Sequence, residues 1–291
     1  MVQPLDPTSP REIVSFFTQH SLSPHRKLGQ NFLVDANIVR KITSAAEIEQ
    51  GDAVIEIGPG AGALTLDMAR AGANILALEI DRGLVRFLSE LLEPWQSVKV
   101  VCQDALNVKW LSLINAHFAA GSAVKLVSNL PYNISGPLMY ALFRERFPFK
   151  SAVLMFQKEV AQRLVAQPGD SNYGGLSVLC SYYTTSKILF EVSNNVFWPR
   201  PSVGSAVLRL EPREQMLNFE EEQLFWKLVA GVFQQRRKTI LNSISRTFSW
   251  PKEQSADFLS QAGIDLAVRP EQLSAEKFAT LIGLVYNGYI K

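Results

Sequence analysis

The residues best suited to chemistry form the quartet Asn129-Leu130-Pro131-Tyr132, which follows a strand-like run at residues 124–128. The Asn129 side-chain carbonyl and the Leu130 backbone carbonyl are two hydrogen-bond acceptors, and the proline restricts the direction of the second. Tyr132 supplies a ring on which a flat, nitrogen-bearing ligand can stack. The alternative is a structural turn between a strand and a helix with Tyr132 in the core, which composition alone favours.

A glycine-rich loop is the second functional pattern. The segment EIGPGAGALTL (residues 56–66) follows an apolar run and contains Gly58, Gly60 and Gly62. Glycines between a strand and a helix allow a ligand to approach the backbone closely. Glu79 follows Gly58 by 21 residues, at the end of the next predicted strand, where a carboxylate can accept hydrogen bonds from ribose hydroxyls. Incidental glycines in a plain strand–turn–helix are the alternative, but the position of the acid favours a nucleoside cofactor.

Acidic residues around this loop indicate the charge of the cofactor. Glu56 precedes the first glycine, where a carboxylate would repel a pyrophosphate but suits a cation. Asp104 follows the third predicted strand and is placed to accept a hydrogen bond from an adenine amino group. Together with Glu79 they favour S-adenosylmethionine, which carries a sulfonium and an ammonium group. The glycine pattern alone does not exclude NAD, because Ala63 is tolerated at its last position.

These residues require a sheet that brings several strand ends together. Five strand-like runs alternate with helical segments, at 53–57, 74–80, 98–103, 124–128 and 151–157. This alternation is typical of a parallel sheet with helices on both faces. Two later runs, 187–192 and 204–212, have no evident helix between them and predict an antiparallel edge. The sequence therefore predicts a Rossmann-like α/β domain at residues 1–212 and a small all-helical domain at residues 213–291.

Length and composition narrow the functional classes. Of the 291 residues, 47% are hydrophobic and 19% are charged, which allows a large core and argues against long disordered segments. The net charge of +2 is too small to indicate nucleic-acid binding by itself. The two cysteines lack CxxC spacing and the three histidines are scattered, so we expect no metal site. No apolar run is long enough for a membrane span and the N-terminus is unlike a secretion signal, so we expect a cytoplasmic protein.

Several motifs resemble those of one known family. The segments KLGQNFLVD, EIGPGAGALT, LEID, QDAL, NLPYNIS, QKEVAQRL, FWPRPSVGSAV and FQQRRKTILNSI occur in this order. Their order is similar to that in the KsgA/RsmA family of small-subunit rRNA adenine N6,N6-dimethyltransferases. The resemblance extends from about residue 25 to the end of the chain. The NLPY and QNFL motifs are specific to it, whereas the glycine loop is common to methyltransferases in general.

The resemblance implies a class I methyltransferase fold that binds S-adenosylmethionine. It implies dimethylation of two adjacent adenines near the 3′ end of small-subunit rRNA, within an immature subunit and by a monomer. The implied donor site comprises Asn31, Leu33, Gly58, Glu79, Asp104 and Asn129. The residues implied in catalysis are the quartet 129–132 and Phe197, whose ring would cover the second face of the target adenine.

Basic residues that could contact RNA phosphates are Arg26, Lys27, Lys158, Arg163, Arg236, Arg237 and Lys238. For any one of them a solvated surface is an equal alternative. Three other functions also remain open. The chain could methylate large-subunit rRNA, although such relatives typically carry Ile at the position of Leu130. It could be an RNA-binding assembly factor without activity, or an NAD-dependent oxidoreductase, which would leave the quartet without a role.

Overall fold

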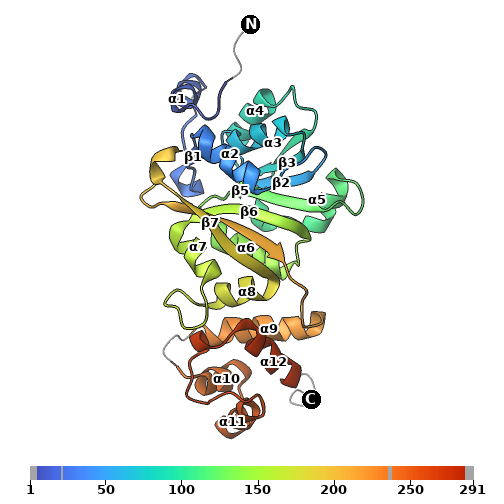
Figure 1. Ribbon diagram of the computed structural model, residues 1–291, viewed down its shortest axis with the longest axis vertical. Helices are drawn as coiled ribbons and strands as arrows, with labels where there is room; N and C mark the ends of the chain where they lie inside the picture. Colours follow the sequence, from blue (N-terminus) through green and yellow to red (C-terminus); the bar gives the residue numbers. More distant parts are fainter. Residues whose placement is uncertain (1–4, 21, 235–237, 286–291) are drawn as a thin grey trace. The chain divides into compact units, whose positions relative to one another are not determined.

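The computed structural model describes residues 5–20, 22–234 and 238–285, and Figure 1 labels its helices and strands. Backbone packing divides the chain into two compact units. The first contains the described residues up to 161 together with 186–212, and the second contains 162–185 together with the described residues from 213 onward. No helix within the described ranges is long and apolar enough to cross a membrane.

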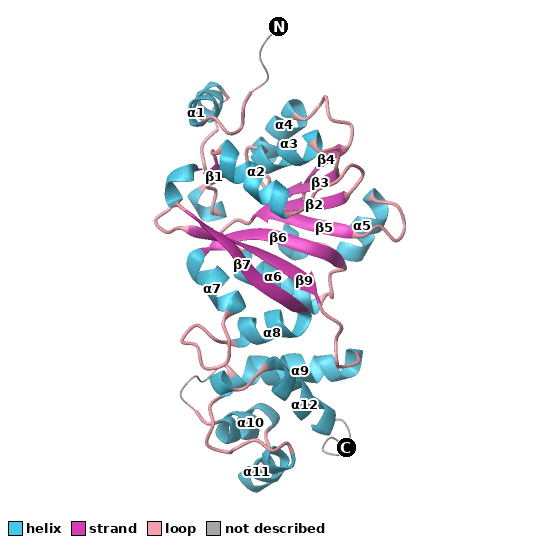
Figure 2. Cartoon of the chain, in the orientation of Figure 1, coloured by secondary structure: helices cyan, strands magenta, loops and turns pink. Residues whose placement is uncertain are grey.

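A seven-stranded sheet runs through the described residues in the order β4-β3-β2-β5-β6-β9-β7 (Figure 2). Its strands are β2 (Ala53–Ile57), β3 (Asn74–Glu79), β4 (Val98–Cys102), β5 (Val124–Asn129), β6 (Phe149–Gln157), β7 (Thr184–Val192) and β9 (Ser205–Pro212). Neighbours from β4 to β6 are parallel, and β9 joins β6 antiparallel. The predicted parallel sheet with an antiparallel addition is confirmed, and each predicted strand end lies within about three residues of the observed one.

The order of the strands determines where a ligand can bind. β2 pairs with β3 on one side and with β5 on the other, so the chain reverses its direction of winding at this point. In open α/β sheets the crevice at such a reversal, outside the carboxyl ends of the strands, is the usual ligand site. The glycine loop follows β2 directly, and the quartet begins with the last residue of β5.

Helices cover both faces of the sheet. Val54 and Ile55, successive residues of β2 that point to opposite faces, are both fully buried. The helices that precede or alternate with the strands are α1 (Pro10–Gln19), α2 (Ala36–Ala45), α3 (Ala63–Arg70), α4 (Arg82–Leu91), α5 (Trp110–His117), α6 (Ser135–Arg144) and α7 (Lys158–Val165). α2 and α3 share one apolar core cluster with β2, β3, β5 and β6, which fixes α3 and the glycine loop on the sheet.

A short ladder outside the main sheet connects two distant segments. β1 (Phe32–Leu33) pairs antiparallel with β8 (Phe197–Trp198), so that Leu33 lies opposite Phe197. Val34 extends the ladder by donating its backbone N–H to the Val196 carbonyl at 2.8 Å. The QNFL segment is therefore held beside the segment that leads into β9.

The second unit is helical. Its helices are α8 (Gly175–Tyr183), α9 (Phe219–Val232), α10 (Ile240–Phe248), α11 (Lys252–Gln261) and α12 (Ala275–Leu284). The sequence-based boundary after residue 212 differs from this grouping at residues 162–185. The physical reason is α8, which packs with α9 and α12. The Tyr183 hydroxyl donates to the buried Glu222 at 3.1 Å, and the Tyr173 hydroxyl donates to the Leu273 carbonyl at 2.8 Å.

Candidate active site

The carboxyl ends of four parallel strands border one cavity in the first unit. Its walls come from four parts of the chain, which are residues 28–33, the glycine loop with the start of α3, residues 78–80 with 103–106, and residues 129–134. It encloses about 1050 Å³ of empty space, its open mouth included. The glycine loop, the three acids and the quartet therefore face a single space, which is large enough for a nucleoside cofactor and an acceptor base.

The glycine loop packs directly against the quartet. Gly58 has φ +69°, and a Cβ there would lie 2.7 Å from Pro131 Cγ. Any other residue would need the left-handed conformation and would also displace the proline. Gly58 and Gly60 both line the cavity. Glycine at position 58 thus brings the loop after β2 and the loop after β5 into contact.

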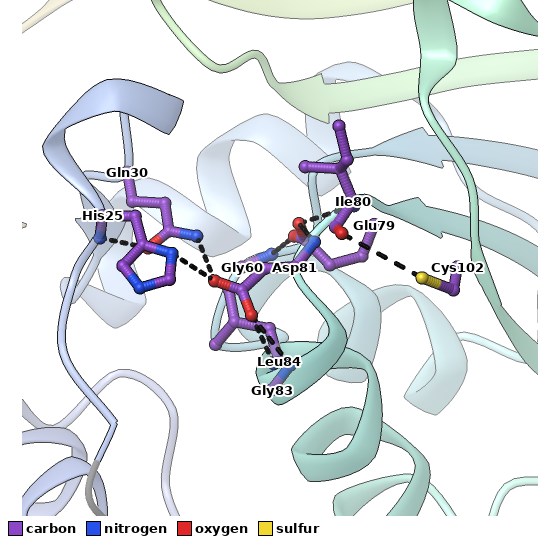
Figure 3. A network of polar contacts seen from close by, with 9 residues as sticks. All are labelled: His25, Gln30, Gly60, Glu79, Ile80, Asp81, Gly83, Leu84 and Cys102. Carbon is purple, nitrogen blue, oxygen red and sulfur yellow. Dashed lines mark hydrogen bonds and ion pairs between the residues drawn. The ribbon is translucent and has the colours of Figure 1, made fainter.

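Glu79 lines the cavity at the end of β3, and Figure 3 shows the contacts of its carboxylate. The residue is 5% exposed, and burial raises the pKa of its carboxyl. Oε1 accepts the backbone N–H groups of Ile80 at 2.8 Å and Asp81 at 2.9 Å. Among the described residues, Oε2 accepts a single long contact of 3.4 Å from the Gly60 N–H, so it retains capacity for the hydroxyls of a ligand.

Glu56 is the most deeply buried acid of the cavity wall. The residue is 2% exposed, and its Oε2 accepts a hydrogen bond from the Thr65 hydroxyl at 2.6 Å. Burial, opposed in part by the hydrogen bond from Thr65 and assisted by the nearby Glu79, raises the pKa of this carboxyl to about 8. A buried carboxyl in this state is stabilised as an anion by a cationic ligand.

Asp104 lines the cavity and also holds its own loop in place. Oδ1 accepts the Leu106 backbone N–H at 2.9 Å, which caps the short 3-10 helix Ala105–Asn107. Oδ2 accepts the Asn107 side-chain amide at 2.7 Å. Each carboxylate oxygen has a second lone pair, so these contacts leave room for an adenine amino group.

Asn129 presents an unpartnered acceptor. Its side-chain Nδ2 donates to the backbone carbonyl of Asn31 at 3.2 Å. Its Oδ1 is buried and has no hydrogen-bond partner among the residues that the structure describes. The next residue, Leu130, has a buried side chain, and its backbone N–H donates to the Met155 carbonyl at 3.2 Å. The end of β5 is therefore joined to β6, and the amide oxygen is left as a buried acceptor without a partner among the described residues.

Tyr132 is anchored through its hydroxyl group. The hydroxyl lies 2.6 Å from the Oγ atom of Ser205, which is buried at the start of β9. Burial raises the pKa of the tyrosine, so the phenol remains protonated. Tyr132 lines the cavity beside Asn129. This tether limits rotation of the ring, as a stacking platform requires.

Two residues expected in the site lie elsewhere. Gly62 does not line the cavity, and a Cβ there would lie 2.9 Å from Leu88 Cδ2, so this glycine allows α3 to approach α4. Phe197 is 4% exposed and belongs to the apolar core cluster that contains Leu33. Its ring holds β8 against that core and does not line the cavity. By contrast, Asn31 and Leu33 line the cavity as expected.

The expected RNA contacts have different surroundings. Lys27 and Lys238 are exposed, and Lys158 forms an exposed ion pair with Glu191 at 2.8 Å. Arg163 is half-buried on α7, and its carbonyl accepts the Ser177 hydroxyl. Arg236 and Arg237 lie outside the described residues, as does the side chain of Arg26. The RNA contacts thus stay a prediction.

Four residues that the sequence analysis did not single out also shape the cavity. Gln30 and Asn133 line it. Asp81 caps α4 and accepts a hydrogen bond from Gln30, and Ser205 anchors Tyr132. All four lie within the family motifs, and Asp81 also carried a local structural signal, since an acid immediately before a helical segment is typical of an N-cap.

The fold and the site together define a class I methyltransferase. A parallel sheet carries a glycine loop after one strand, an acid at the end of the next, and a cavity with three acids in its wall. Within the described ranges, no group of three or more His, Cys, Asp or Glu residues is arranged to hold a metal ion. The family model described as ribosomal RNA adenine dimethylase matches residues 22–286, and the chain belongs to this family.

Curated relatives are similar over nearly the whole chain. The protein named ribosomal RNA small subunit methyltransferase A from Pelotomaculum thermopropionicum is 43% identical, covering 94% of this chain and 95% of the relative. The protein of the same name from Moorella thermoacetica is 42% identical, covering 94% of this chain and 96% of the relative. The sequence-based assignment to this family is confirmed. The predicted α/β class, the adenine dimethyltransferase class and S-adenosylmethionine as the cofactor are confirmed with it.

Solved structures agree with the fold. A dimethyladenosine transferase from Plasmodium falciparum matches with a TM-score of 0.71 and 28% identity, covering 87% of this chain and 97% of that one. The 23S rRNA methyltransferase ErmE matches with a TM-score of 0.65 and 24% identity, covering 88% of this chain and 100% of that one. The second likeness shows the shared fold alone.

Proposed function

We propose that this chain uses S-adenosylmethionine to dimethylate N6 of two adjacent adenosines near the 3′ end of small-subunit rRNA. The observation that carries the proposal is the buried, unpartnered Oδ1 of Asn129, a residue that lines the cavity. Leaving a buried acceptor unpaired costs about 1–3 kcal/mol. Its position therefore supports a ligand that brings an N–H group, as the amino group of adenine does. The curated relatives, named as small-subunit methyltransferases, support the rRNA substrate.

The chemical task is to make a poor nucleophile reactive. The lone pair of the adenine amino group is delocalised into the ring. In the first transfer the Asn129 side-chain carbonyl and the Leu130 backbone carbonyl accept its two N–H bonds, which turns the lone pair out of the ring plane. In the second transfer one of these carbonyls accepts the single N–H that remains. The Tyr132 ring holds the base by stacking, worth about 1–3 kcal/mol. The Ser205 hydroxyl keeps that ring in place.

When bound, S-adenosylmethionine supplies a methyl group on a positively charged sulfur. Transfer forms the bond from N6 to the methyl carbon, breaks the bond from sulfur to carbon, and leaves the electron pair on sulfur. Glu79 accepts from the ribose, Asp104 accepts from the adenine, and Glu56 balances the positive charge. The proton leaves N6 for solvent after transfer, when the product nitrogen is acidic. Catalysis is thus mainly positioning and electrostatics.

The proposal includes the setting of the reaction. The target adenine has to leave its stack to enter the cavity, which favours single-stranded rRNA in an immature small subunit. The protein acts there as a monomer in the cytoplasm. Exposed Lys27 and Lys238 are proposed to contact phosphates. Large-subunit rRNA is the second candidate substrate, and Leu130 argues against it because such relatives typically carry Ile there.

Single-turnover methyl transfer tests the proposal. Undermethylated small subunits, large subunits and a saturating methyl donor are the reagents, and product adenosines are separated after digestion. We expect transfer to small subunits and none to large ones. Asn129→Ala slows transfer on the order of a hundredfold to a thousandfold because its carbonyl acts on the reacting amino group. Asn37→Ala, a change at an exposed asparagine of α2, is the control. A wild-type rate for Asn129→Ala contradicts the mechanism, and transfer to large subunits alone contradicts the substrate.

A further inference from the structure

The segment His25–Asn31, here called the strap, crosses from the donor side of the cavity to the acceptor side. At the donor side both of its side-chain contacts end on Asp81 (Figure 3). Gln30 Nε2 donates to Asp81 Oδ2 at 3.0 Å, and His25 Nδ1 lies 3.0 Å from the same oxygen. The side chain of Asp81 is 11% exposed and that of His25 is 57% exposed, so the carboxylate is largely buried while the imidazole reaches solvent.

Asp81 uses its other groups for two different neighbours. Its Oδ1 accepts the backbone N–H groups of Gly83 at 2.8 Å and Leu84 at 3.3 Å, which caps α4. Its own backbone N–H donates to Glu79 Oε1 at 2.9 Å. One residue therefore joins the strap, the start of α4 and the ribose-binding acid.

At the acceptor side the strap contacts the quartet and the residue after it. Asn133 Nδ2 donates to the Lys27 carbonyl at 3.1 Å. A Cβ on Gly29 would lie 2.8 Å from Asn133 Oδ1 and 3.2 Å from the Tyr132 nitrogen, so the backbones are in close contact. The Asn31 carbonyl accepts Asn129 Nδ2. This last contact decides which end of the Asn129 amide is free, and it leaves the oxygen unpaired.

We propose that Gln30 and Asp81 are positioning residues for methyl transfer, holding the strap so that its Asn31 carbonyl orients the Asn129 amide while residues 28–33 close the donor cavity. The inference rests on the proposed function and extends it to two residues that need not touch either substrate. Release of the strap from Asp81 affects both the binding of the donor and the positioning of the acceptor amino group. It loosens the donor cavity, and it frees the Asn129 amide to rotate.

The direction of the hydrogen bonds allows a sharp test. The His25 backbone N–H donates to Gln30 Oε1 at 2.7 Å, so the Gln30 nitrogen has to face Asp81. In Asp81→Asn the new amide oxygen still caps α4, because Asn caps as well as Asp does. The new amide nitrogen then faces the Gln30 nitrogen, and two donors meet. Rotating the Gln30 amide cannot relieve this, since its nitrogen would then face the His25 N–H.

The reverse exchange restores complementarity. In Gln30→Glu alone, two carboxylates face each other. In the double variant with Asp81→Asn and Gln30→Glu, the Asn amide donates to the new carboxylate, whose other oxygen accepts the His25 N–H. The second amide hydrogen can be accepted by His25 Nδ1 of the neutral ring. We expect each single variant to raise the donor KM and lower kcat, with kcat/KM about tenfold to a hundredfold lower. The double variant returns both constants to within about threefold of wild type.

Asp35→Asn is the matched control. Asp35 caps α2 by accepting the Asn37 and Ile38 N–H groups at 2.9 and 3.0 Å, and it does not line the cavity. The Asp35→Asn variant should leave kcat, the donor KM and the melting temperature unchanged. Wild-type constants in both single variants overturn the inference, as does a double variant no better than the singles. Donor affinity by calorimetry provides a readout without rRNA. If the wild type binds donor but methylates no subunit, the proposed function fails, while the affinities of the four proteins still test the strap.

Discussion

Burial of Glu56 predicts that donor binding releases a proton. The pKa of this carboxyl is raised to about 8, mainly by burial, so the free protein holds it neutral at pH 7. S-adenosylmethionine brings a positive charge into the cavity that Glu56 lines. A cation favours the ionised carboxylate, so binding lowers the pKa and expels the proton.

The magnitude follows from the pKa. With a pKa of about 8, about 1% of Glu56 is ionised at pH 6 and about half at pH 8. If only the ionised form binds the donor, the apparent affinity rises about 50-fold between these pH values, with nearly one proton released at pH 7. Adenosine, which carries no cationic group, should bind without proton release.

Calorimetric titration at pH 7 in two buffers with different ionisation enthalpies measures the released protons. Glu56→Gln should reduce the number to near zero, and it retains an acceptor for the Thr65 hydroxyl. Equal heats for wild type in both buffers, together with pH-independent affinity, would refute the reasoning.

The pH dependence of the free energy of unfolding provides a second test. A carboxyl whose pKa is raised by folding contributes stability that is fully present below pH 4.5 and is lost as the pH rises toward 8. Melting temperatures of the free protein should therefore fall less over this range in Glu56→Gln.

Two further predictions concern Glu79 and Tyr132. Glu79→Gln should weaken donor affinity about 10- to 150-fold, since hydrogen bonds to a charged group contribute about 1.5–3 kcal/mol. Calorimetry checks this, and unchanged affinity in the folded variant excludes the ribose role. Tyr132→Phe keeps the stacking ring but loses the 2.6 Å contact with Ser205 and should slow single-turnover transfer about fivefold, less than Tyr132→Ala. Ser205→Ala should match Tyr132→Phe, and combining them should add little, whereas full additivity would show that the contact does not orient the ring.

Much of the donor site was predictable from sequence because its signals are local. A glycine loop between a strand and a helix, an acid 21 residues after Gly58, and an acid after the third strand each follow one strand end. Parallel strands place their carboxyl ends along one edge, so Glu79, Asp104 and Asn129 had to meet once the sheet was predicted. The cavity that they line confirms that reasoning.

The second unit shows what local sequence patterns do not predict. The break after residue 212 is visible in the sequence because strand-like alternation ends there. The membership of residues 162–185 is not visible, because it depends on α8 packing with α9 and α12, helices more than 30 residues further along the chain. Apolar residues of a helix show that it is buried, but not which helices cover it.

The sequence alone determined the family, the parallel sheet and the residue types available for chemistry, because period and spacing are properties of neighbouring residues. The tertiary structure decided which way those side chains point. It buries Phe197 in the core through the β1–β8 ladder, and it uses Gly62 to bring α3 close to α4. It also places the Asn31 carbonyl against the Asn129 amide and Gln30 against Asp81. These contacts join residues 51 to 98 positions apart, and no pattern of neighbouring residues specifies the direction of such hydrogen bonds.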